Sequence, residues 1–168
     1  LIGYRAAYNA TDSVNTAVVI GYDGMYENTD STGNVAIGYY AMRQASGGSS
    51  RDYNIAIGYN SMKNANPHMS IAIGYNAGQY LRDGVTGAVH IGTEAGKYAS
   101  GSFNTFIGYT AGSGGTTSAP YSTGTGNTVV GYGALTAFTS AANNVAIGYS
   151  TAQSLTTGNL STAVGVSA

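Results

Sequence analysis

A short phrase, Ile-Gly-Tyr-any-small, returns ten times along these 168 residues. Ile or Val precedes its glycine in every copy, and Tyr follows the glycine in eight of the ten. The glycines recur at intervals of 16 to 23 residues: Gly3, Gly21, Gly38, Gly58, Gly74, Gly92, Gly108, Gly131, Gly148 and Gly165. Self-similarity of this kind indicates a repeat architecture. We therefore expect one repeat domain over residues 1–168, as a piece of a longer fibre.

The repeat unit has the features of a short strand. The copy at 34–39, Asn-Val-Ala-Ile-Gly-Tyr, is β-branched and too short for a helix. Alternation along a strand places Val35, Ile37 and Tyr39 on one face and the small residues between them on the other. The small face fits a narrow interior and the large face must also pack, but the pattern leaves open which of them lines the coil. One strand with turns per repeat predicts an all-β solenoid of about ten coils, stacked about 4.8 Å apart.

Certain positions of the repeat are therefore expected to be structural. They are Ile37, Gly38, Ile57, Gly58, Ile73, Gly74, Ile107, Gly108, Ile147 and Gly148. Two intervals are longer than the others and carry Gly-, Ser- and Thr-rich insertions near 43–53 and 112–126. Insertions in solenoids form loops on one face, and ligands often bind there. The alternative is a surface loop that the fold tolerates and that binds nothing.

Charge is scarce, with six basic and seven acidic residues, and none follows Lys97. The chain therefore lacks the basic surface patch with which proteins bind nucleic acid or an acidic lipid surface, and we exclude both partners. No apolar run approaches the 18 residues of a membrane span. Cysteine is absent, and His68 and His90 have no partners at metal-ligand spacing, so we expect no metal and no cofactor. The carboxylates form no calcium loop and are expected to be solvated.

The copies at 34–39, 54–59 and 143–149 resemble the head repeats of YadA-like trimeric autotransporter adhesins. They are equally similar to the Ala-Ile-Gly-Tyr repeats of bacteriophage tail fibres. The resemblance extends over essentially the whole chain. It implies a left-handed parallel β-roll assembled as a parallel homotrimer, located outside the cell on a virion tail fibre or a bacterial surface. The repeats here are longer than those of adhesin heads, and their tyrosine is more regular, which favours the fibre branch.

Tyrosine is the most conspicuous chemistry of the chain. Eight tyrosines in one register predict a ladder of rings about 5 Å apart, which either seals the coils and subunits together or offers a platform for sugars. Other tyrosines lie outside this register, in the variable segments. These are the better candidates for contact with a ligand: Tyr40, Tyr53, Tyr80, Tyr98 and Tyr121.

The pattern favours a structural and adhesive role over catalysis. An acyltransferase of the hexapeptide-repeat class would need the phrase three times per coil, and no catalytic elbow Gly-x-Ser-x-Gly occurs. A regular threonine array for ice binding is also missing. We therefore expect a homotrimeric fibre segment, without enzyme activity, that forms or displays a surface for a glycan or protein receptor. The alternative is a self-assembling extracellular filament without a dedicated receptor.

Overall fold

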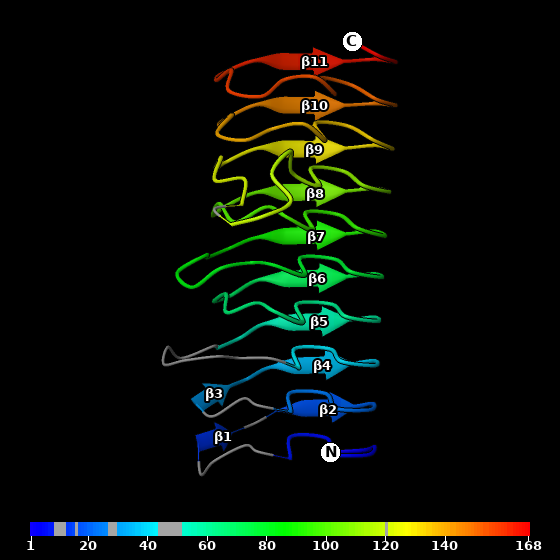
Figure 1. Cartoon of the computed structure of the whole chain (residues 1–168), viewed down its shortest axis with the longest axis vertical. Helices are drawn as coiled ribbons and strands as arrows, with labels where there is room; N and C mark the ends of the chain where they lie inside the picture. Colours follow the sequence, from blue (N-terminus) through cyan, green and yellow to red (C-terminus); the bar gives the residue numbers. More distant parts are fainter. Residues whose placement is uncertain (9–12, 16, 27–29, 44–51, 120) are drawn as a thin grey trace.

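The structure, a computed structural model, describes residues 1–8, 13–15, 17–26, 30–43, 52–119 and 121–168. These residues form short parallel strands and turns, and no helix occurs among them. Nine strands stack into one sheet, which makes a solenoid of about eight turns (Figure 1). The prediction of an all-β solenoid is thus confirmed. Of the expected insertion at 43–53, residues 44–51 lie outside the described part of the chain.

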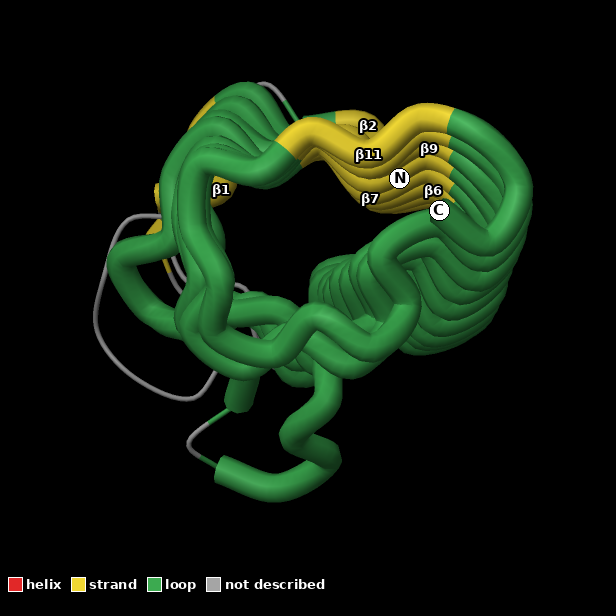
Figure 2. Tube along the Cα trace, turned by 90° about the horizontal axis from the view of Figure 1, so that it is seen from above, coloured by secondary structure: helices red, strands yellow, loops and turns green. Residues whose placement is uncertain are grey.

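All strands are three residues long and each coil contributes one of them to the main sheet. In order, these are β2 (Val18–Ile20), β4 (Val35–Ile37), β5 (Ile55–Ile57), β6 (Ile71–Ile73), β7 (Val89–Ile91), β8 (Thr105–Ile107), β9 (Thr128–Val130), β10 (Val145–Ile147) and β11 (Thr162–Val164). A separate parallel pair is formed by β1 (Ser13–Asn15) and β3 (Asp30–Thr32). Viewed along the axis, the sheet forms one side of the coil and turns form the remainder (Figure 2).

Equivalent residues of successive repeats lie directly above one another. Ile37 pairs with Ile57, and Ile57 pairs with Ile73, without any shift in register. The unequal repeat lengths are therefore absorbed entirely in the turns. The interval between β8 and β9, the longest of all, forms an extra loop beside the coil (Figure 1). Each type of repeat residue consequently forms a column along the whole axis.

The repeat glycine is required because successive coils approach closely at this point. All ten repeat glycines have φ between 129° and 141°, a region that side chains disfavour. A β-carbon added at Gly58 would also come within 2.5 Å of the carbonyl oxygen of Gly74 in the next coil. Both constraints hold at every repeat glycine except Gly165 in the last coil, where only the φ angle applies, and this explains why the phrase retains glycine.

The small face of the strand lines the interior of the coil. Ala36, Ala56 and Ala72 lie at the centres of their strands and are completely buried. The residues on either side of these alanines are only partly covered. Ile147, which follows the buried Ala146, has 39% of its surface exposed. The structure thereby decides what the sequence pattern leaves open: the large β-branched face points outwards.

A buried column of asparagines supports the start of the strands. The amide of Asn54 donates to Oδ1 of Asn34 over 2.8 Å, and the amide of Ser70 donates to Oδ1 of Asn54 over 2.9 Å. The same link joins the coils of Asn104 and Asn127. Each side chain thus satisfies a backbone donor of the following coil, where water has no access.

Candidate functional site

Three of the five tyrosines singled out in the sequence come together in space. The rings of Tyr80 and Tyr98 stack at 5.4 Å between centroids, and Tyr121 lies 5.1 Å from Tyr80. Tyr80 and Tyr98 each lie six residues after their repeat glycine, so the unshifted register places them one coil apart. Tyr121 comes from the insertion, where the parallel bridge of Ser122 with Ala99 places it beside Tyr98, with 6.1 Å between the ring centroids. The cluster therefore combines the regular coil with its longest loop.

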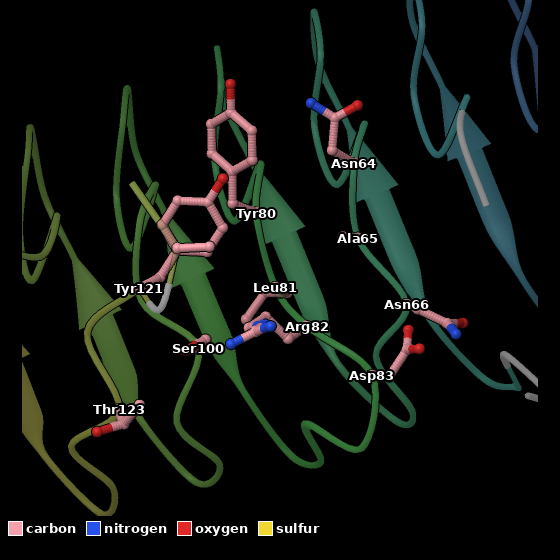
Figure 3. A pocket seen from close by; sticks show the side chains of 11 residues that line it. Asn64, Ala65, Asn66, Tyr80, Leu81, Arg82, Asp83, Ser100, Tyr121 and Thr123 are labelled. Carbon is pink, nitrogen blue, oxygen red and sulfur yellow. The ribbon is translucent and has the colours of Figure 1, made fainter. Parts of the chain in front are cut away.

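Beside this cluster lies a groove of about 770 Å³ (Figure 3). It extends over several neighbouring coils and combines aromatic rings with donors and acceptors of hydrogen bonds. Its lining is formed by Asn64, Ala65, Asn66, Tyr80, Leu81, Arg82, Asp83, Ser100, Ala119, Tyr121 and Thr123. In Figure 3, the rings of Tyr80 and Tyr121 lie next to each other, Arg82 lies near Ser100, and Asp83 lies near Asn66. Polar side chains predominate in this lining, and the rings of Tyr80 and Tyr121 provide its aromatic surface.

The insertion is joined to the coil beside Tyr121. The Ser122 amide donates to the Tyr98 carbonyl over 3.0 Å, and the Ser100 amide donates to the Ser122 carbonyl over 2.7 Å. Ser122 is buried, whereas 117–119 are exposed. Part of the segment 112–126 thus continues the coil backbone, and this part holds the Tyr121 ring against its neighbours.

The surroundings of Tyr121 raise the pKa of its hydroxyl. Partial burial raises the pKa of Tyr121, and the nearby Tyr80 raises it further, against an opposing effect of Arg82. Like an ordinary tyrosine, Tyr121 is protonated at neutral pH and can donate a hydrogen bond. Arg82 and Asp83 carry opposite charges and are both exposed, so the groove offers charge of both signs. Sequence reasoning missed these two residues because they lie in a variable turn; their proximity to an off-register tyrosine was the available signal.

The other two candidate tyrosines lie elsewhere. Tyr40 contacts Tyr39 at 4.0 Å between ring centroids, and its hydrogen bond raises the pKa of Tyr39 to about 12. Tyr53 is 59% exposed and meets the edge of His68 at 6.3 Å. Neither lines the groove.

The in-register tyrosines form the predicted ladder, but in two parts. One runs through Tyr4, Tyr22, Tyr39, Tyr59 and Tyr75 with centroids 5.1 to 5.3 Å apart. The other joins Tyr109, Tyr132 and Tyr149 at 5.0 Å. Between the two parts the position after Gly92 is Thr93. The expected spacing of about 5 Å is confirmed wherever two tyrosines adjoin.

Asp23 corrects the expectation that the carboxylates are solvated. Its side chain is completely buried and accepts two hydrogen bonds of 2.8 Å from the Arg5 guanidinium. Arg43 lies 3.5 Å away on the other side. The hydrogen bonds from Arg5 raise the pKa of that guanidinium above its usual range. Asp23 is buried because two cations from neighbouring coils compensate its charge.

His90 belongs to the interior and not to a surface site. It is completely buried in β7, stacks on Phe106 at 5.0 Å, and neither ring nitrogen has a hydrogen-bond partner. Burial lowers the pKa of His90 to about 3, so the imidazole is neutral. Within the described ranges, no group of three or more His, Cys, Asp or Glu residues is placed to hold a metal ion.

Comparison with protein-family models, with curated proteins and with solved structures found no match for this chain. The part of the chain that the structure describes contains no helix suited to crossing a lipid bilayer.

Proposed function

We propose that this chain is a segment of a structural and adhesive fibre, on a phage tail or a bacterial surface, that presents a receptor-binding groove. The groove beside Tyr80, Tyr98 and Tyr121 is the observation that carries the proposal. At this place the insertion adds the ring of Tyr121 to the stacked rings of Tyr80 and Tyr98, and the groove lies beside them. We further propose a left-handed solenoid of about ten coils, as the sequence resemblance implies.

A glycan is the receptor class that this groove suits best. The C–H faces of a sugar pack against tyrosine rings, while its hydroxyl groups both donate and accept hydrogen bonds. Asn64 and Ser100 can do both, Arg82 donates and Asp83 accepts. A groove with this lining matches a neutral sugar better than a strongly charged ligand, because its two charges are of opposite sign.

We propose that the outer face of the sheet is the interface of a parallel homotrimer. Large β-branched residues cover this face, and they keep exposed fractions such as 38% for Ile20, 37% for Ile107 and 39% for Ile147. The apolar stripe runs from β2 to β11 at the same place in every coil. A partner with the same coil spacing can cover this stripe along its whole length. Another copy of this chain has that spacing.

A glycan array with the purified chain tests the receptor proposal. We expect selective binding that Tyr121→Ala weakens at least tenfold, which corresponds to about 1.4 kcal/mol. Tyr149→Ala is the matched control, because it removes a ladder tyrosine outside the groove lining. Absence of any retained glycan, or equal binding by both variants and the parent chain, would contradict the proposal.

Light scattering tests the assembly. A trimer of fixed mass supports the fibre segment, whereas polymers of growing mass support the filament without a receptor.

A further inference from the structure

The tyrosine ladder is interrupted at a single position, in the coil of β7. Thr93 lies where every neighbouring coil from Gly3 to Gly148 has a tyrosine, and its side chain is exposed. The flanking rungs are Tyr75 in the preceding coil and Tyr109 in the following one. They are 49% and 50% exposed. We call the space over Thr93, between these two rings, the ladder gap.

The ladder gap has the dimensions of one additional ring. Coils stack about 4.8 Å apart, so the rings of Tyr75 and Tyr109 lie about 10 Å from each other. Rings stack with centres about 4.5 to 7 Å apart, so a ring inserted midway, at about 5 Å from each, contacts both. The neighbouring rungs demonstrate this spacing, with 5.3 Å from Tyr59 to Tyr75 and 5.0 Å from Tyr109 to Tyr132.

The coil of Thr93 also provides polar groups next to the ladder position. Glu94 follows Thr93 directly, and its Oε1 accepts hydrogen bonds from Lys97 Nζ over 2.7 Å and from Asn76 Nδ2 over 3.3 Å. At the equivalent position of the first coil, the guanidinium of Arg5 lies 5.1 Å from the centroid of the Tyr4 ring. The hydrogen bond from Lys97 lowers the pKa of Glu94, so the carboxylate stays charged and accepts hydrogen bonds.

We propose that the ladder gap binds one pyranose ring of a glycan, between Tyr75 and Tyr109. The two apolar faces of the sugar stack on the two tyrosines, and its hydroxyl groups bond to the Thr93 hydroxyl and the Glu94 carboxylate. A purely aromatic ligand would leave this polar edge unused. The inference takes its ligand class from the proposed function, but the site is separate from the groove, whose lining contains none of these four residues.

The decisive variant is Thr93→Tyr, which fills the gap with a ring of the protein itself. Binding is measured by saturation-transfer NMR and calorimetry, with a panel of methyl pyranosides and the corresponding trisaccharides as probes. We expect at least a tenfold loss of affinity for Thr93→Tyr, together with an unchanged or higher melting temperature. Glu94→Gln provides a second test, with a severalfold loss, because it keeps the shape and removes the charged acceptor.

Matched variants separate this site from the groove. Tyr121→Ala changes the groove and leaves the ladder gap intact, so sugar binding that depends on Thr93 must survive it. Tyr59→Thr opens a second gap between Tyr39 and Tyr75, flanked by Asn60 instead of a carboxylate, and should add a weaker site.

Unchanged affinity in folded Thr93→Tyr would overturn the inference. A change of oligomeric mass in that variant, without loss of sugar binding, would also overturn it, because the gap would then hold a side chain of a second copy.

Discussion

Gly112 faces the ring of Phe106 across the interior of the coil, so closely that an added β-carbon would lie 2.5 Å from Phe106 Cγ. The two positions are six residues apart, and other coils fill the same pair differently. Gly96 faces the buried His90 in the same manner, whereas buried Met62 occupies this position where the strand holds Ala56. In these three coils, a large residue at one position faces a small residue at the other, because the two positions share one volume.

This complementarity predicts a rescue. Gly112→Met should destabilise the chain by about 1 to 3 kcal/mol through overpacking, and Phe106→Ala by about 3 to 5 kcal/mol through a cavity. The double variant recreates the pair of Ala56 and Met62, and the backbone permits it, since φ is 54° at Gly112 and 51° at Met62. We expect the double variant to lose much less free energy of unfolding than the sum of the losses in the two single variants. Urea unfolding of all four chains measures the coupling, and strictly additive effects would contradict the pairing.

His90 makes the stability dependent on acid. Its pKa is about 3 in the folded chain and near 6.5 when unfolded, so the unfolded chain binds an additional proton between these values. The contribution of neutral His90 to the free energy of unfolding is therefore fully present above pH 6.5. It falls by about 1.4 kcal/mol per pH unit between pH 6.5 and pH 3. His90→Phe fits opposite Gly96 and should flatten this decline. Urea midpoints at pH 7, 5.5 and 4 report it; parallel curves for both chains would refute the assignment.

The buried asparagines should contribute more to the free energy of unfolding than exposed polar residues do. Asn127 donates from Nδ2 to the Ala141 carbonyl over 2.9 Å, and its Oδ1 accepts from the Asn144 amide over 3.1 Å. Asn127→Ala leaves both partners without water and should lower the free energy of unfolding by about 1 to 3 kcal/mol for each unsatisfied group. Ser140→Ala, at an exposed position, is the control and should change it by less than about 0.5 kcal/mol. Equal effects in a thermal or urea melt would contradict this role.

A charge on the outer sheet face should prevent assembly. Ile57→Asp and Ile147→Asp leave the interior of the coil untouched, because these side chains point outwards. In the proposed trimer each carboxylate would be buried without a partner, which costs several kcal/mol. We expect folded monomers by circular dichroism and light scattering, while Gln153→Asp at an exposed turn position keeps the parental mass. A folded Asp variant of unchanged mass would show that this face is not the interface.

The local pattern was sufficient to predict the columns of the structure. A repeat that places Ile or Val before every glycine and Tyr after eight of the ten predicts that these residues stack, since a buried strand face fixes the pairing register. The stacked rings of Tyr39 and Tyr59 and the pairing of Ile37 with Ile57 follow directly. Expectations for the charged residues succeeded less well, because the burial of Asp23 depends on Arg5, a residue of the preceding coil.

What the sequence by itself determined was the order of residues along the axis: an all-β solenoid with one strand, one glycine and one ring position per coil. Only the tertiary structure decided what meets across a coil or from loop to coil. The inward direction of Ala36, the contact of Gly112 with Phe106 and the approach of Tyr121 to Tyr80 depend on the path of the turns. Repetition specifies neighbours along one direction, whereas the turns vary in length and bring together residues that have no common period.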